Sequence, residues 1–473
     1  MLEPLRRTCS QAPLLLAGLL LSLVVLVATG CQTPSTTRNS GPSIQFAKYH
    51  LDNGLTVILH EDHNLPRVAI NLWYAVGGKD EEPGRSGFAH LFEHLMFMGT
   101  SEVPRGVFDH VIEIAGGNNN ATTSPDRTNY FENGPANMLE TFLFLEADRM
   151  TRLGPDMDQE RLDLQREVVR NERRERYDNQ PYGQSFLEFW HLMYPEGHPY
   201  YEPVIGSHED LERASLDDVK SFFAKYYVPA NCCLVVAGDF DSSEAKVWIQ
   251  KYFGPIPKRP APPRTRSEPV KLEGEVSKTL EDNVKLARTS LIYHSPAFYA
   301  EGDADLDVVA SLLGQGKTSL LYRRLITEKK LAKDVVAYQR SMELGSNFVI
   351  VATARKGVDL EMLEKEIDAV VAEFLESPQV QEEVDRARSS IEVSFWHQAE
   401  PLADRADLLN QYQYYFGDPG AIQVDMERYE KVTPDSAHDW AKRILLSKGR
   451  VVLRVVPARE KPADKESPAP SSS

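Results

Sequence analysis

The sequence predicts an α+β protein built from two domains. A chain of 473 residues is longer than a domain with a single hydrophobic core usually is. Gly254–Pro269 is rich in proline and basic residues, which is typical of a linker. Each half closes with a predicted helix and then a strand, at Leu216–Tyr226 and Cys232–Ala237 and again at Pro434–Leu445 and Val451–Val456. We interpret this recurrence as a weak internal repeat.

The same features divide the chain into segments. We expect a signal peptide (1–30), a flexible tether (31–44), a domain with a metal site (45–255), a linker (256–280), a second domain of similar size (281–460) and a disordered tail (461–473). The net charge of −17 argues against a nucleic-acid partner, which requires a basic face. An acidic surface could favour basic substrates, but it usually serves only solubility.

The N-terminal segment has the pattern of a bacterial lipoprotein signal. Arg6 and Arg7 precede the apolar run Leu14–Val27, which is short for a membrane span. The small residues before Cys31 resemble a lipobox, so we expect Cys31 to carry a lipid anchor. Because Ala28 stands where leucine is usual, ordinary secretory cleavage remains the alternative. By analogy with known sorting signals, Gln32 favours the outer membrane, facing the periplasm.

Local patterns predict the remaining elements. Asn53-Gly54 predicts a hairpin within Tyr49–His60, with His60 and His63 on the surface. Cys232 and Cys233 point to opposite faces of a strand and are expected to be buried without bridging each other. We further expect strands at Val68–Val76, Val284–Tyr293, Val335–Gln339 and Phe348–Thr353, and helices at Val107–Ile114, Asn137–Met150, Gln184–Met193, Asp303–Leu313, Ser319–Thr327, Leu360–Leu375 and Glu382–Trp396.

The most informative motif is His90-Leu91-Phe92-Glu93-His94, which lies in an apolar, helix-compatible run. On a helix, His90 and His94 lie one turn apart on the same face, where two imidazoles can bind one metal ion. The alternative is a pair of ordinary core histidines, but burying three polar groups without a shared partner is costly. The motif is the inverted order of the zinc-peptidase helix, so we predict zinc, with Glu93 as the proton-accepting base.

A catalytic zinc needs a third protein ligand, and the charged run Leu164–Arg176 offers one. It contains neither glycine nor proline and should form a helix. Val168, Val169 and Glu172 fall on one stripe, so Glu172 could point inward with the valines. The alternative is that the run is simply a solvated, charged helix.

These motifs together resemble the insulinase or pitrilysin family of zinc peptidases (M16), which includes mitochondrial processing peptidase. The resemblance rests on the inverted motif, on the segment Ala115–Thr123, and on Arg166-Glu167-Val168-Val169-Arg170-Asn171-Glu172, whose last residue lies 78 residues after His94. It implies two homologous α/β sandwich domains, each with a mostly antiparallel sheet packed with helices, of the LuxS/M16 metallopeptidase-like type.

The resemblance also implies roles for single residues. Glu172 would be the third ligand of one Zn²⁺ per chain, and Asn120 with Ala121 would begin an edge strand that binds the substrate backbone. Many members carry a glutamate that supports the site where this chain has Gln165, so either the amide of Gln165 takes this supporting role or the role is lost. The implied activity is that of a metalloendopeptidase, which hydrolyses peptides or small unfolded proteins in an enclosed chamber.

One departure from the family pattern concerns the second half. Active members carry an arginine and, seven residues later, a tyrosine in the opposing unit, and this chain has Ile326 and Lys333 at those places. We therefore expect a heterodimer with a homologous subunit that lacks the zinc motif and supplies both side chains, a homodimer being possible. The rival hypothesis is a non-catalytic, zinc-binding subunit of a protein complex.

Overall fold

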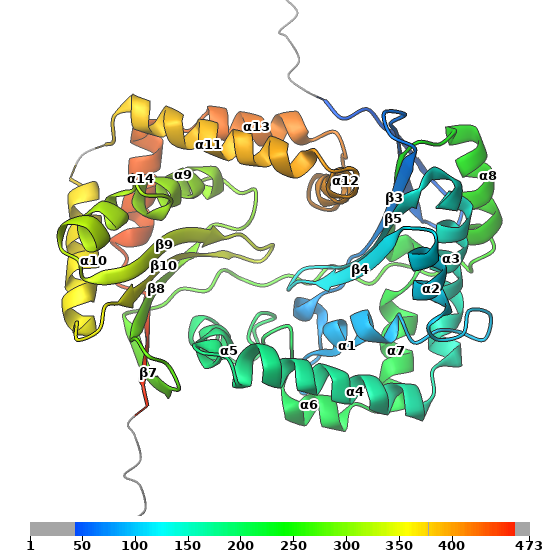
Figure 1. Ribbon diagram of the computed structural model, residues 1–473, viewed down its shortest axis with the longest axis horizontal. Helices are drawn as coiled ribbons and strands as arrows, with labels where there is room; N and C mark the ends of the chain where they lie inside the picture. Colours follow the sequence, from blue (N-terminus) through cyan, green and yellow to red (C-terminus); the bar gives the residue numbers. More distant parts are fainter. Residues whose placement is uncertain (1–42, 377, 459–473) are drawn as a thin grey trace, which may run out of the picture. The chain divides into compact units, whose positions relative to one another are not determined.

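Two mixed β-sheets, each packed with helices, make up the described residues of the computed structural model (Figure 1). These residues are 43–376 and 378–458, and all of them belong to one compact unit. The expected signal peptide, the lipidated Cys31 and the C-terminal tail lie outside them. No helix of the described residues has the length and apolar character that crossing a bilayer requires.

The first sheet has the strand order β1-β2-β6-β3-β5-β4. Its strands are β1 (Ala47–His50), β2 (Thr56–Glu61), β3 (Arg67–Tyr74), β4 (Asn118–Thr123), β5 (Thr128–Pro135) and β6 (Cys232–Gly238). The hairpin predicted from Asn53-Gly54 is confirmed, because β1 and β2 pair antiparallel around it. His60 was expected on the surface, and this is wrong: only 6% of it is exposed, since it lies in β2 with Nδ1 2.7 Å from the Gln45 carbonyl.

The helices of the first half are α1 (Phe88–Leu95), α2 (Val107–Ile114), α3 (Leu139–Asp156), α4 (Gln159–Arg173), α5 (Gly183–Met193), α6 (His208–Arg213), α7 (Leu216–Tyr226) and α8 (Ser242–Phe253). Short 3₁₀ turns occupy Gly78–Asp80, Ala136–Met138 and Pro229–Asn231, and a π-helical turn occupies Arg174–Asp178. The sequence reading missed α6 and α8. The start of α8 could have been recognised in the sequence, because Asp241 is a typical N-cap residue. In the structure its side chain accepts hydrogen bonds from the backbone N–H groups of Ser243 and Glu244.

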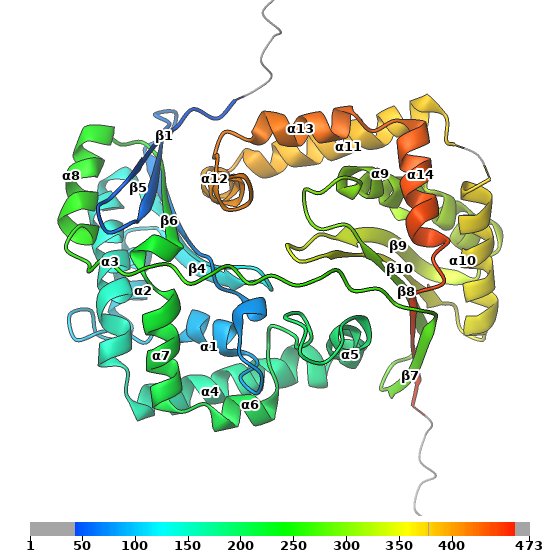
Figure 2. The ribbon, with the colours of Figure 1, turned by 180° about the vertical axis from the view of Figure 1, so that it is seen from behind.

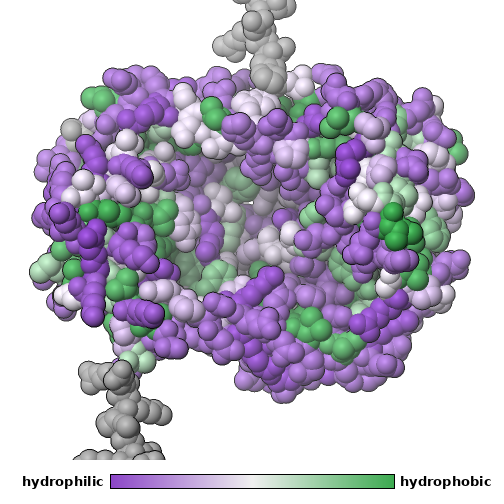
Figure 3. All heavy atoms as spheres, in the orientation of Figure 1, coloured by the Kyte–Doolittle hydropathy of each residue, from purple (hydrophilic) through white to green (hydrophobic). Residues whose placement is uncertain are grey.

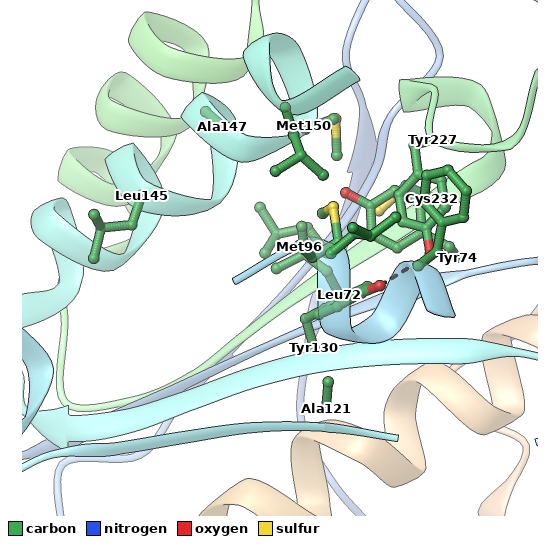
Figure 4. Packing of buried hydrophobic residues seen from close by; sticks show 14 of the residues in the cluster. Leu72, Tyr74, Met96, Ala121, Tyr130, Leu145, Ala147, Met150, Tyr227 and Cys232 are labelled. Carbon is green, nitrogen blue, oxygen red and sulfur yellow. Dashed lines mark hydrogen bonds between the residues drawn. The ribbon is translucent and has the colours of Figure 1, made fainter. Parts of the chain in front are cut away.

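The core of the first half lies between its sheet and these helices (Figure 4). Leu72 and Tyr74 from β3 pack there with Met150 of α3. The hydroxyls of Tyr130 and Tyr227 lie 2.9 Å apart inside this core, which satisfies both buried polar groups. The core therefore fixes α1 against the sheet, since Leu91, Phe92 and Leu95 of that helix are fully buried in it.

The second sheet has the strand order β7-β11-β8-β10-β9. Its strands are β7 (Val276–Asp282), β8 (Arg288–Ser295), β9 (Ala332–Arg340), β10 (Ser346–Ala354) and β11 (Val451–Pro457). Figure 2 shows the residues between α8 and β7 as an extended trace that links the two sheets. The sequence reading missed β7, so the last residues of the segment expected to be linker form a strand.

The helices of the second half are α9 (Asp303–Gly314), α10 (Leu360–Phe374), α11 (Gln381–Ala399), α12 (Leu402–Phe416), α13 (Ile422–Glu430) and α14 (Pro434–Leu445). The helix expected at Ser319–Thr327 is a π-helical segment, Tyr322–Glu328. The sequence reading missed α12 and α13. Helix α12 packs on β3 and β6 of the first sheet, where Ala406 and Leu409 cover Ile58 and Val235.

The two sheets share one topology, which supports the weak repeat seen in the sequence. The closing strand of each half, β6 or β11, pairs parallel with an earlier strand (β2 or β7) and antiparallel with the next one (β3 or β8). Beyond these, the orders β3-β5-β4 and β8-β10-β9 correspond, and β1 is the extra strand of the first sheet. The predicted α+β fold of two homologous sandwich domains is confirmed, while their predicted boundaries stay predictions.

Candidate metal centre

Helix α1, which carries the two histidines, begins at a close approach of two loops. Gly87 precedes the helix with φ = 85°, a conformation that L side chains rarely adopt. A Cβ at Gly87 would lie 2.9 Å from the Cα of Gly206, so no side chain fits there. The carboxylate of Glu81 accepts hydrogen bonds from the backbone N–H groups of Gly87 (2.9 Å) and Ala89 (2.8 Å), which caps the helix.

The structure brings His90, His94 and Glu172 together. Glu172 Oε2 lies 3.1 Å from His94 Nε2 and 3.6 Å from His90 Nε2. Three ligands placed tetrahedrally about a zinc ion at roughly 2.0–2.1 Å would have donor atoms about 3.3 Å apart. These two separations are close to that spacing, and all three donor atoms lie within 4.8 Å of one another, so the three side chains can converge on one zinc ion. Among the described residues, no other group of three or more potential ligands comes together in this way.

The charges around this cluster favour metal binding. Burial, followed by the neighbouring His94, lowers the pKa of His90 to about 4, so its imidazole is neutral and able to coordinate at neutral pH. Burial acts to raise the pKa of Glu172, but its hydrogen bond with His94 and the nearby cationic groups lower it overall. Arg176, in the π-helical turn after α4, forms a 2.8 Å ion pair with Glu172 Oε1 and leaves Oε2 for the metal.

Glu93 lies beside the cluster and contacts the edge strand. Its Oε2 accepts a 2.5 Å hydrogen bond from the hydroxyl of Thr123 in β4. Burial raises the pKa of Glu93, which this hydrogen bond partly offsets. A carboxylate with a raised pKa is a better proton acceptor, which suits the role of general base.

The cluster opens into a cavity of about 760 Å³. Figure 3, which has the orientation of Figure 1, shows a hollow near the middle of the face that it displays. The first half contributes the metal cluster, residues 120–127 and the aromatic side chains of Trp73, Phe186 and Trp190. The second half contributes Phe298, Arg340, Ser341, Met342, Asp407, Gln411 and Tyr415. A cavity of this volume is large enough to hold several residues of a peptide beside the metal cluster.

The strand β4 forms the edge of the first sheet, next to the metal helix. Asn120 and Ala121 lie in it and line the cavity, as the family resemblance implies. The N–H of Ala121 donates to the side-chain oxygen of Asn120 at 2.9 Å. A peptide carbonyl that pairs with this edge would replace the Asn120 oxygen.

The remaining predicted residues are placed as follows. Gln165 donates its amide N–H to the sulfur of Met98 at 2.8 Å, without a hydrogen bond to any of the three candidate ligands, so its supporting role stays a prediction. Val168 was expected to point inward with Glu172, which is wrong, because 39% of it is exposed while Val169 is fully buried. Neither Ile326 nor Lys333 lines the cavity.

Sequence reasoning assigned no role to Glu81, Thr123 or Arg340. Strand alternation could have indicated Thr123, because it shares a face of β4 with Ala121. Arg340 lies far in the sequence from the aromatic rings that it contacts, so no local pattern indicates it. Glu81 lies only six and eight residues before the N–H groups that it caps.

Comparison with known proteins agrees with this geometry. The family description "Insulinase (Peptidase family M16)" matches residues 56–201, and "Peptidase M16 inactive domain" matches residues 213–391. The zinc protease PqqE of Helicobacter pylori is 31% identical over 366 residues, which are 76% of this chain and 82% of that protein. The chain belongs to the insulinase family, M16.

Other M16 proteins extend the comparison. The mitochondrial-processing peptidase subunit beta of Arabidopsis thaliana, described as probable, is 22% identical over 317 residues, which are 64% of this chain and 59% of that protein. The crystal structure of a protease from Helicobacter pylori superposes with a TM-score of 0.82 at 28% identity and covers 88% of this chain and 100% of that one. The crystal structure of a "peptidase M16 inactive domain" from Pseudomonas fluorescens superposes with a TM-score of 0.78 at 19% identity. The match covers 88% of this chain and 98% of that one, which shows a shared fold.

Proposed function

We propose that this chain is a zinc-dependent endopeptidase that hydrolyses peptides or small unfolded proteins. The observation that carries the proposal is the meeting of His90, His94 and Glu172 beside Glu93, at the wall of a cavity bordered by an edge strand. The name of the relative from Helicobacter pylori, a zinc protease, supports the same activity. One zinc ion per chain fits the single cluster found among the described residues.

The zinc ion would supply a Lewis acid and would lower the pKa of a water that it binds to about 7. Glu93 accepts a proton from the attacking water and delivers it to the leaving amine. Thr123 holds Glu93 in place through its hydroxyl. The peptide lies extended along β4, pairing with the backbone near Asn120 and Ala121.

A homologous partner subunit would complete the site. The family's arginine and tyrosine positions hold Ile326, which packs against the core of the second half, and Lys333, which is exposed. A metal-less homologue that supplies both side chains across an enclosed chamber fits this pattern, with a homodimer as the alternative. We propose that the complex lies in the bacterial cell envelope, lipid-anchored at the outer membrane and facing the periplasm; the resemblance of the N-terminal segment to a lipoprotein signal supports this.

The test is to purify the chain alone, measure its zinc content, and assay cleavage of unstructured peptides before and after chelation. We expect zinc close to one per chain and, once the homologous subunit is added, cleavage that chelation abolishes and zinc restores. Robust turnover by the lone chain would exclude an obligatory partner. Stoichiometric zinc without cleavage, even after the homologous subunit is added, would favour the rival function of a non-catalytic zinc-binding subunit.

A further inference from the structure

Arg340 is an unpaired cation in the cavity that holds the metal cluster. It is the last residue of β9, an edge strand of the second sheet. Its guanidinium makes no ion pair and no side-chain hydrogen bond within the described residues. The other two arginines that line the cavity are engaged: Arg176 with Glu172, and Arg127 with the carbonyl and hydroxyl of Thr122.

Aromatic rings hold Arg340 in place. Its guanidinium carbon lies 4.7 Å from the ring centre of Phe189, 5.5 Å from that of Phe186 and 5.6 Å from that of Trp190. All three rings belong to α5, which packs against the second sheet. Contact with aromatic faces orients a guanidinium while leaving its N–H donors free for a ligand. The side chain is thus preorganised to bind an anion.

The acidic residues of the same cavity do not neutralise Arg340. Asp126 accepts hydrogen bonds from Tyr200 and from the backbone N–H of Glu343, and it lies 3.8 Å from the buried ammonium of Lys79. Asp407 accepts from donors of the first sheet. Glu93 and Glu172 belong to the metal cluster. The positive charge of Arg340 is therefore available to a substrate, although the whole chain is acidic.

We propose that Arg340 binds a carboxylate of the substrate peptide and so selects peptides with an acidic group at one fixed distance from the cleaved bond. Guanidinium and carboxylate match as a bidentate hydrogen-bonded pair, and a site between aromatic rings strengthens that pair by excluding water. The carboxylate comes either from an Asp or Glu side chain or from the C-terminus of a short peptide. The inference rests on the proposed peptidase function and names the substrate class of that site.

The test measures binding to the zinc-loaded full chain with Glu93→Gln, so that no cleavage intervenes. Fluorescently labelled ten-residue peptides carry one Glu that is moved along an otherwise neutral sequence, each with a matched Gln peptide, and all ends are blocked. A second set has no Glu but a free C-terminal carboxylate. We expect one Glu position, or the free C-terminus, to bind about ten- to a hundredfold more tightly than its neutral match.

In the Arg340→Gln variant this preference should disappear while the affinity for the neutral peptides stays unchanged. Arg340→Lys should keep part of the preference, which also guards against a folding defect in the glutamine variant. Arg340→Glu should prefer a peptide with Lys at the same position. Arg443→Gln is the matched control, because Arg443 is exposed and stacks on Trp440 at 4.6 Å but does not line the cavity.

The outcomes separate this inference from the proposed function. Equal binding of acidic and neutral peptides, or a preference that survives Arg340→Gln, would overturn the role of Arg340 and leave the peptidase proposal intact. An equal loss of affinity for both peptide classes in Arg340→Gln would also overturn it, because the arginine would then act on the peptide backbone or on the fold. Failure of every peptide to bind the zinc-loaded chain, both alone and with the homologous subunit added, would overturn both.

Discussion

The hydroxyl of Thr123 donates a 2.5 Å hydrogen bond to Glu93 and so joins the edge strand β4 to the metal helix α1. The strand that is proposed to bind the peptide thereby also orients the proposed base. A change in the strand is therefore expected to alter the chemistry as well as peptide affinity.

Replacing Thr123 by Val should lower kcat about tenfold, since Glu93 loses the group that orients it. Zinc content and thermal stability should stay close to those of the wild type. Steady-state kinetics with one peptide checks this, and Thr151→Val, whose hydroxyl donates to the Ala147 carbonyl outside the cavity, is the control. A change in KM alone would contradict the orienting role.

Replacing Glu93 by Gln should lower kcat at least about a hundredfold while leaving zinc bound. The amide keeps the size of the side chain but cannot take a proton from the attacking water. Metal analysis and peptide cleavage on the same preparation check both halves of the prediction. Cleavage at the wild-type rate would remove Glu93 from its role as base.

Replacing Glu172 by Gln should lower zinc affinity at least about tenfold, because the carboxylate that lies 3.1 Å from His94 is lost. Competition with a coloured chelator measures this directly. Glu160→Gln is the matched control, because Glu160 lies on the same helix but is exposed. If the two variants bind zinc equally well, Glu172 is not a ligand.

Asp407 of α12 is expected to stabilise the packing of that helix on the first sheet. Its Oδ1 accepts from Trp73 Nε1 at 2.7 Å, Asn129 Nδ2 at 2.9 Å and Asn71 Nδ2 at 3.1 Å. Asp407→Ala leaves buried donors without an acceptor and should lower the free energy of unfolding by about 1–3 kcal/mol. Denaturant unfolding measures this, with the exposed Asp404→Ala on the same helix as control. Equal stability of the two variants would argue against the prediction.

Asp307 should make stability depend on pH. Burial, and then the charge of Asp303, raises the pKa of Asp307 to about 7 in the folded chain, against about 4 when unfolded. Between these values the folded state holds a proton that the unfolded state has released. This group's contribution to stability therefore falls as pH rises from about 4 to about 7.

Asp307→Asn removes that dependence and can still accept the hydrogen bond from Tyr429. The variant's free energy of unfolding, minus that of the wild type, should grow with pH and become constant above about pH 7. Denaturant titrations of both proteins at several pH values measure this difference in free energy of unfolding. The contributions of the other titrating groups are the same in both proteins and cancel in the difference. A difference that does not vary with pH would show that Asp307 titrates normally.

Local patterns in the sequence predicted most elements of both halves. Asn53-Gly54 marked a real hairpin, and the predicted helices at Val107–Ile114 and Leu216–Tyr226 have the bounds found in the structure. Helix α12 was missed because its apolar residues join two separate clusters. Ala406 and Leu409 pack on the first sheet and Tyr412 packs with Ala421 and Ile422, so the helix lacks the one-sided apolar pattern of a surface helix.

The sequence by itself determined which side chains could bind zinc, because the spacing of His90 and His94 on one helix turn is a local property. It also indicated Glu172 through the family pattern. The tertiary structure decided that Glu172 meets the two histidines, that Thr123 holds Glu93 and that Arg340 faces the same cavity. These contacts join segments far apart in the chain, and only the packing of the strands and helices fixes the distances between them.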